Sequence, residues 1–181
     1  MNKRQVLMLV LPLLLLLGGC SPDGFVRRGV RYCIDGDGAV VIARRGIPYR
    51  GEVVIPDSIT YNFKVYAVKG IGDEAFAHSR VTAVTLPATI EQVGVRAFAG
   101  CTQLRALHCQ MSDPVEVDST AFKELNPELI TLYVPMGSGT AYENTPCWRQ
   151  LHIDEEGTPA ATTLPDGPDE PDEPSDSTAQ P

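Results

Sequence analysis

The sequence feature that most constrains the fold is a short motif, an apolar residue, three intervening residues and then Ala-Phe, which the chain carries three times. The copies are Ile71-Gly-Asp-Glu-Ala75-Phe76, Val93-Gly-Val-Arg-Ala97-Phe98 and Val117-Asp-Ser-Thr-Ala121-Phe122. Their phenylalanines follow one another at intervals of 22 and 24 residues. A period of this length is typical of a solenoid. We therefore expect Phe76, Phe98 and Phe122 to form the structural core of the stacked repeats.

Each repeat has a second set of apolar residues after its Phe, which predicts one short strand. The sets are Val81, Val84, Leu86 and Pro87, then Leu104, Leu107 and Cys109, then Leu129, Leu132, Val134 and Pro135. We interpret each unit as a helical turn that carries Ala-Phe inward, a bend and a β-strand. A unit this small cannot bury its apolar face alone, so neighbouring units must stack and share a core. The predicted fold class is therefore an α/β repeat that forms a short solenoid.

These motifs resemble the BspA-type leucine-rich repeat, a class found in surface lipoproteins of the Bacteroides group. The matching segments are Val53-Val-Ile-Pro-Asp-Ser-Ile-Thr60, Ile71-Gly-Asp-Glu-Ala-Phe76 and residues 93–104, and a closing segment with Leu132-Tyr-Val-Pro135, Tyr142 and Trp148 is similar to the family's terminal cap. The likeness covers about residues 32–153. Two departures are local: His78-Ser79 replaces Gly-Cys, and Cys109-Gln110 replaces an apolar residue and Pro. The resemblance implies an adhesion-type protein that binds a protein or glycan partner.

The first twenty residues are typical of a bacterial lipoprotein signal peptide. Lys3 and Arg4 precede an apolar run over residues 6–17, which is shorter than the roughly 20 residues that cross a bilayer. Leu17-Gly-Gly-Cys20 then closes the run and resembles a lipobox. We predict that residues 1–20 are a signal peptide, that Cys20 becomes lipidated, and that the chain is anchored in the cell envelope, at the outer membrane. The alternative is a cleaved secretory signal with an incidental cysteine, and the choice between the surface and the periplasmic face stays open.

Acidic residues are concentrated at the C-terminal end of the chain. The net charge is −8, and nine acidic residues follow Ile153, so the preceding body is nearly neutral. Residues 154–181 are rich in Pro, Asp and Glu, and Leu164 is their only large apolar residue. Such a segment buries too little surface to offset the entropy of ordering. We predict a disordered acidic tail over residues 154–181, and the export of the chain argues against nucleic acid as a partner.

Two β-hairpins are predicted before the first Ala-Phe motif. Residues 30–34 and 39–43 flank Asp35-Gly-Asp-Gly38, and Asp-Gly between β-rich runs is a strong hairpin signal. A second hairpin is expected around Tyr61-Asn-Phe-Lys-Val65. Terminal repeats of a solenoid need an atypical outer face. The predicted order is therefore an N-terminal β-hairpin cap over residues 21–50, leucine-rich repeats over 51–137 and a C-terminal cap over 138–153, in a monomer.

The cysteines that follow the signal do not predict a metal site. Cys33, Cys101, Cys109 and Cys147 show no Cys-x-x-Cys spacing, and their disulfide state stays open. His108 and Cys109 are neighbours on a strand, so their side chains point to opposite faces. The loop Asp35-Gly-Asp-Gly38 lacks the bidentate Glu of a calcium loop. We therefore expect no metal and no cofactor.

No motif supports an enzyme. Gly137-Ser138-Gly139 resembles part of a serine hydrolase motif, but Met136 stands where that motif requires Gly. His78, His108 and His152 each occur without a paired catalytic motif, and no Gly-rich phosphate loop is present. The sequence therefore predicts no catalytic residues.

The strands of the repeats predict an exposed column of side chains. The aligned quartets are Val53-Val54-Ile55-Pro56, Val84-Thr85-Leu86-Pro87, Leu107-His108-Cys109-Gln110 and Leu132-Tyr133-Val134-Pro135. Alternation along a strand buries the first and third residue and exposes the second. We therefore predict a partner-binding column of Val54, Thr85, His108 and Tyr133, with Glu52, Ala83, Ala106 and Thr131 beside it. Solenoids use such faces for binding. The alternative is a structural component of the envelope without a soluble ligand.

Overall fold

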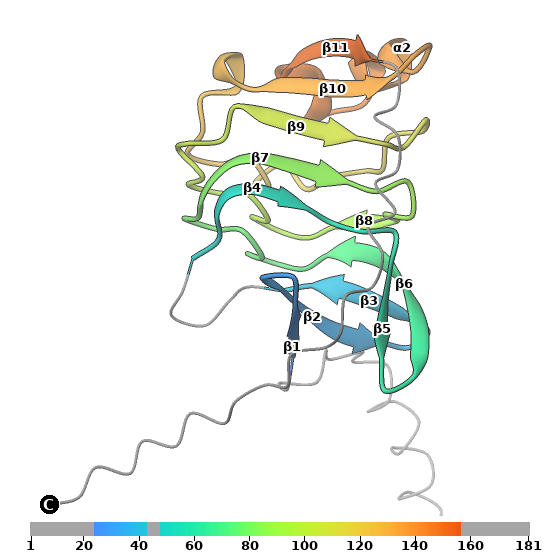
Figure 1. Cartoon of the computed structure of the whole chain (residues 1–181). Coiled ribbons are helices and arrows are strands. Elements are labelled where there is room, and N and C mark those ends of the chain that lie inside the picture. Colours follow the sequence, from blue (N-terminus) through green and yellow to red (C-terminus); the bar gives the residue numbers. More distant parts are fainter. Residues whose placement is uncertain (1–23, 43–47, 157–181) are drawn as a thin grey trace, which may run out of the picture.

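The computed structural model describes residues 24–42 and 48–156, and these residues form mainly β-strands (Figure 1). The strands are β1 (Phe25–Arg27), β2 (Val30–Asp35), β3 (Gly38–Val41), β4 (Arg50–Val54), β5 (Ser58–Tyr61), β6 (Lys64–Ile71), β7 (Arg80–Leu86), β8 (Gln92–Val93), β9 (Ala106–Cys109), β10 (Thr131–Pro135) and β11 (His152–Glu156). One α-helix, α2 (Gly139–Asn144), and two 3-10 helices, η1 (Pro127–Leu129) and η2 (Trp148–Gln150), complete the described elements.

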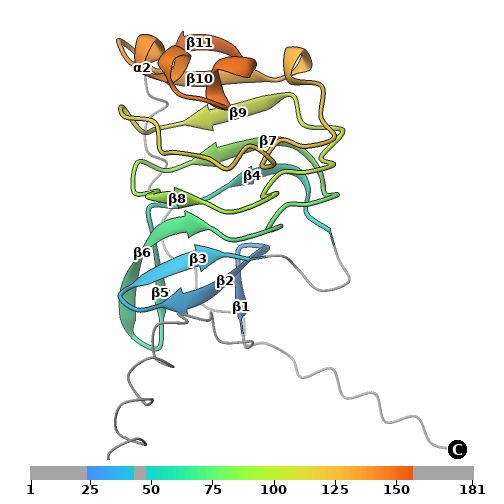
Figure 2. The same cartoon turned by 180° about the vertical axis from the view of Figure 1, so that it is seen from behind.

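The strands stack as the rungs of a solenoid with two sheet faces (Figures 1 and 2). One face is a sheet in the order β11-β10-β9-β7-β4, and all of its neighbouring strands are parallel. We call it the repeat sheet. The other face is a sheet in the order β1-β2-β3-β6-β5, in which β8 also pairs with β6. A single bridge from Val93 to Val117 continues this second face into the third repeat.

The Ala-Phe segments are turns rather than the expected helical turns. The amide of Phe76 donates to Ala97 O at 2.8 Å, and the amide of Phe98 donates to Ala121 O at 3.0 Å. The backbone donors of the first segment alternate between an oxygen of the next repeat and an oxygen three residues back, and none uses the oxygen four residues back that an α-helix uses. His78, Gly100 and Glu124, each two residues after a Phe, have positive φ, which ends any helical path. The solenoid of leucine-rich repeat type is confirmed, but the α/β detail of the prediction is not, because the Ala-Phe segments between the strands are turns.

Aromatic rings form a continuous stack through the core. Phe76 and Phe98 lie with their centroids 5.3 Å apart, and Phe98 and Phe122 with theirs 5.7 Å apart, both nearly parallel. Trp148 meets Phe122 edge-on at 5.6 Å, and Tyr49 packs on Phe76 at 4.8 Å. All five residues are buried. The ring of one repeat thus provides the packing surface for the next, and one aromatic residue closes each end of the stack.

The two predicted hairpins are both present. β2 and β3 pair antiparallel, with Asp35 opposite Gly38, and β5 and β6 pair antiparallel, with Tyr61 opposite Lys64. β3 also runs parallel to β6, so the first hairpin extends the second sheet at the N-terminal end of the solenoid. The second hairpin projects beyond β2 at the same end (Figures 1 and 2).

The C-terminal end of the solenoid reaches further than the predicted cap. β11 runs parallel to β10 up to Glu156, so residues 154–156 belong to the fold and not to a disordered tail. Strand pairing uses the backbone, and the acidic side chains of β11 remain exposed, which is why polar composition is a poor guide to this boundary. The predictions for residues 1–20, for Cys20 and for residues 157–181 lie outside the described residues.

Candidate binding face

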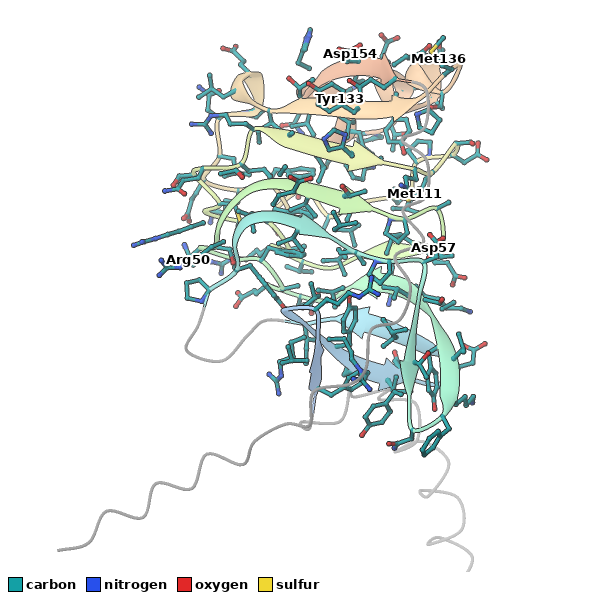
Figure 3. The ribbon with its side chains drawn as sticks, viewed as in Figure 1. Arg50, Asp57, Met111, Tyr133, Met136 and Asp154 are labelled. Atoms are coloured by element: carbon teal, nitrogen blue, oxygen red, sulfur yellow. The ribbon has the colours of Figure 1, made fainter. Side chains whose placement is uncertain are left out.

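The repeat sheet brings the predicted column together on adjacent strands. Val54 pairs with Thr85, Thr85 with His108, and His108 with Tyr133. A fifth strand adds Asp154, which pairs with Tyr133 and lies beside it in Figure 3. The parallel register therefore places five consecutive side chains in one line across the face.

The members of the column differ in exposure. Val54 is 56% exposed, and His108 and Tyr133 are half-buried. Thr85 is only 8% exposed, so its predicted exposure is wrong. It lies on β7 inside the sheet, and its short side chain stands between Val54 and the larger His108 on the two flanking strands. The accessible part of the column therefore has two separate regions. One is the apolar Val54, and the other is the pair His108 and Tyr133 with Asp154 beside it.

His108 and Tyr133 form a stacked aromatic pair on this face. The rings of His108 and Tyr133 are stacked, with centroids 4.6 Å apart and an angle of 12° between their planes. A shallow hollow beside them is lined by His108, Gln110, Tyr133, Pro135 and Glu156. Cross-strand aromatic pairs hold one another in place. The pair is therefore a flat, preformed surface with ring nitrogens and a hydroxyl at its edges.

The second predicted column borders the aromatic pair with small side chains. Ala83, Ala106 and Thr131 are half-buried and pair across three strands, and Glu52 and His152 lie at its two ends. Because alanine and threonine are small, the rings of His108 and Tyr133 project further from the sheet than the side chains beside them. A ligand lying along the sheet can therefore reach the ring edges without meeting bulky neighbours.

Sequence reasoning missed the contribution of β11 to this face. Asp154, Glu156 and His152 all lie on that strand. Tyr133 and Asp154 are 21 residues apart, which is close to the repeat interval, so the spacing alone carried a signal for another rung. The polar composition of the segment concealed it.

A carboxylate holds β11 to the loop that follows β10. Glu155 Oε2 accepts a hydrogen bond from the Gly137 amide at 3.0 Å, and Oε1 accepts one from the Gly139 amide at 2.7 Å. These two hydrogen bonds lower the pKa of the Glu155 carboxyl. They join the last strand to the rest of the face and so fix Asp154 and Glu156 beside the aromatic pair.

Three buried cysteine thiols are structural. Cys101, Cys109 and Cys147 are free and buried. The Cys101 thiol donates to Phe76 O at 2.8 Å, and burial raises its pKa to about 11. Burial also raises the pKa of Cys109 well above its usual value. The raised pKa keeps the thiols of Cys101 and Cys109 protonated, and protonated thiols are poor nucleophiles and poor metal ligands.

The Ser138 hydroxyl binds within its own turn. Ser138 is buried, and its hydroxyl donates to the carbonyl of Pro135, which ties it to the turn before α2. Within residues 24–42 and 48–156 no cluster of His, Cys, Asp and Glu side chains is arranged to hold a metal ion. In the same part of the chain no helix is long and apolar enough to cross a bilayer.

A family comparison matches the middle part of the described chain. Residues 69–145 match the family described as BspA type leucine rich repeat region, with six copies. Residues 69–145, which include β7, β9 and β10, are BspA-type leucine-rich repeats. No curated protein sequence matches the chain.

A solved structure of a leucine-rich repeat protein shares the fold, and two others align less closely. The chain aligns with such a protein from Bacteroides capillosus at 21% identity and a TM-score of 0.55, over 74% of this chain and 99% of that one. It also aligns with a leucine rich cell surface protein from Faecalibacterium prausnitzii at 19% identity and a TM-score of 0.46, over 75% of this chain. A leucine-rich repeat protein from Bacteroides ovatus aligns at 21% identity and a TM-score of 0.47, over 71%. The chain spans 43% and 40% of these last two proteins. At these identities the likeness concerns the fold alone.

Proposed function

We propose that this chain is a non-enzymatic binding protein of the cell envelope, anchored through acylated Cys20, that holds a protein or glycan partner on the repeat sheet. The observation that carries the proposal is the stack of His108 on Tyr133, centroids 4.6 Å apart, on the outward face of a rigid parallel sheet. The BspA-type family supports an interaction role and not a catalytic one.

The physical chemistry of the aromatic pair suits a ligand that presents a flat face. Tyr provides a large contact area, loses little side-chain entropy on binding and has a hydroxyl that can hydrogen-bond. His108 is held against it before any ligand arrives, so binding does not have to order the pair. A peptide backbone or a sugar ring can lie on such a surface while Asp154 and Gln110 meet its polar groups.

The anchor is supported by the order of the N-terminal sequence. A basic start, an apolar run and Leu17-Gly-Gly-Cys20 occur in the arrangement that lipoprotein processing requires. Acylation of Cys20 would hold the repeats at a membrane, and two or more acyl chains give stable attachment. A location in the cell envelope favours an extracellular or periplasmic ligand.

The experiment is a pull-down and array screen of the mature full-length protein against matrix proteins and glycans. The double variant His108→Ala and Tyr133→Ala should weaken the binding found with wild type more than tenfold, which is over about 1.4 kcal/mol. The control is Val26→Ala with Val95→Ala, which truncates two exposed apolar residues outside the repeat sheet. Binding unaffected by the His108 and Tyr133 changes would contradict the proposal. Wild type that binds no ligand would favour a purely structural role in the envelope.

A further inference from the structure

The tip of the β5–β6 hairpin carries an aromatic residue that the fold does not use. Asn62 and Phe63 form the two-residue turn, with φ of 48° and 60°. Turns of this kind favour Asn followed by Gly, because positive φ is costly for a residue with a bulky side chain. Phe63 nevertheless occupies the second position, and its side chain is fully exposed at 105%. An aromatic residue that is strained and fully exposed to solvent suggests a contact with something other than the folded domain.

The surroundings of Phe63 combine apolar, aromatic and cationic groups. Val65 is 64% exposed on the outer side of the hairpin. The ammonium of Lys64 lies 4.8 Å from the ring centre of Tyr66. Aromatic residues with a neighbouring lysine are typical of protein surfaces at the boundary between lipid and water, where the lysine stem is buried and its charge stays in the headgroup layer.

The hairpin also lies next to the part of the chain that leads to the anchor. The ring of Phe25 stacks on Tyr61 with centroids 4.1 Å apart and 13° between the planes. Tyr61 is the residue directly before the turn. Cys20 precedes Phe25 by five residues, and a chain of that length spans at most about 18 Å. An acylated Cys20 therefore keeps the hairpin tip within a short distance of the headgroup layer.

We propose that Phe63 and Val65 insert into the interface of the bilayer that holds the acyl chains of Cys20. This inference rests on the anchor of the proposed function. A bilayer fits better than a protein pocket, because a single projecting side chain needs no matching cavity in a fluid phase. The second contact limits rotation of the solenoid about its anchor. Because β10 and β11 lie at the opposite end (Figure 1), it also turns His108 and Tyr133 away from the membrane.

The test places a tryptophan at the tip of the mature, acylated full-length protein in the variant Phe63→Trp. The matched control is Met136→Trp, since Met136 is 71% exposed and lies at the far end of the solenoid (Figure 3). The native Trp148 is buried and contributes the same background to both variants. Each variant is reconstituted into phosphatidylcholine vesicles with ordinary or brominated acyl chains, and co-flotation with the vesicles is measured alongside the fluorescence.

We expect brominated lipid to remove about half or more of the emission that the Phe63→Trp substitution adds, because an interfacial residue lies about 5–10 Å into the boundary region. The emission of the Met136→Trp variant should not change. Flotation of the Phe63→Trp variant without quenching would overturn the insertion and leave the anchor intact. Failure to float would overturn the anchor and the insertion with it. A blue-shifted Phe63→Trp emission that brominated lipid does not quench would assign the tip to a second protein molecule and also overturn the proposal.

Discussion

The rings of Phe76 and Phe98 lie parallel, with centroids 5.3 Å apart and 5° between their planes. The two residues belong to consecutive repeats, so the contact joins units that lie 22 residues apart in the chain. Phe98 is also stacked on Phe122 at 5.7 Å. Removing its ring therefore opens a cavity between three repeats at once.

We expect Phe98→Ala to lower the free energy of unfolding by about 3–5 kcal/mol, a large share of the stability of a domain of this size. Phe63→Ala is the matched control, because it removes the same atoms from a fully exposed position. Urea unfolding followed by circular dichroism measures both. A Phe98→Ala midpoint equal to that of the control would mean that the stack does not hold the repeats together.

Acidification should weaken the attachment of β11. The pKa of Glu155 is lowered in the folded state by the Gly137 and Gly139 amides. Its contribution to stability is therefore present above the carboxyl's ordinary pKa, about 4.5, and is lost as the pH falls through the lower folded value. The protection factors of the Gly137 and Gly139 amides, measured by NMR and corrected for the slower intrinsic exchange at low pH, should fall on acidification. Glu155→Gln should show fast exchange already at neutral pH, whereas Glu156→Gln should behave as wild type.

Alkaline conditions should destabilise the fold in part through Cys101. Burial raises the pKa of its thiol from 9.0 to about 11. Between these values the unfolded chain has lost the proton that the folded protein keeps, so the free energy of unfolding falls as the pH rises. Below about pH 9 the thiol is protonated in both states, and its full contribution to the free energy of unfolding is present. Cys101→Ala should show a shallower fall over this window in urea titrations, and a slope identical to that of wild type would refute the assignment.

The anchor can be tested without any binding partner. Cys20→Ser should abolish acylation and leave an unprocessed precursor, because the sulfur that receives the lipid is gone. Detergent phase partitioning and mass spectrometry of the exported protein measure this. Ser21→Ala serves as the control and should be processed normally. Mature Cys20→Ser protein in the detergent phase would point to a different anchor.

The strand register was predictable from sequence because it depends on side-chain alternation. Val54, Thr85, His108 and Tyr133 align in the sequence quartets and pair in the sheet. The local conformation of the Ala-Phe segments was not predictable in the same way. Residues such as Glu74 and Arg96 are good helix formers, yet both adopt positive φ because their segments bond to neighbouring repeats.

The sequence pattern also could not predict how exposed a single side chain is, or at which residue the fold ends. Alternation assigns Thr85 to the outer face, but the size of its neighbours decides how much water reaches it. β11 has the acidic composition of the residues that follow it, although Glu155 and the backbone of β10 hold it in the sheet. In both places the deciding interaction comes from another strand, which the local sequence of the segment does not include.

NMR mapping of a bound ligand tests the central claim most directly. The full-length protein is titrated with a partner from the screen, and the chemical shifts of backbone amides and side chains are followed. We predict that the largest changes lie at His108, Tyr133 and Asp154 on the repeat sheet. Changes confined to the turns around Glu74 and Arg96, or to residues 157–181, would contradict the account.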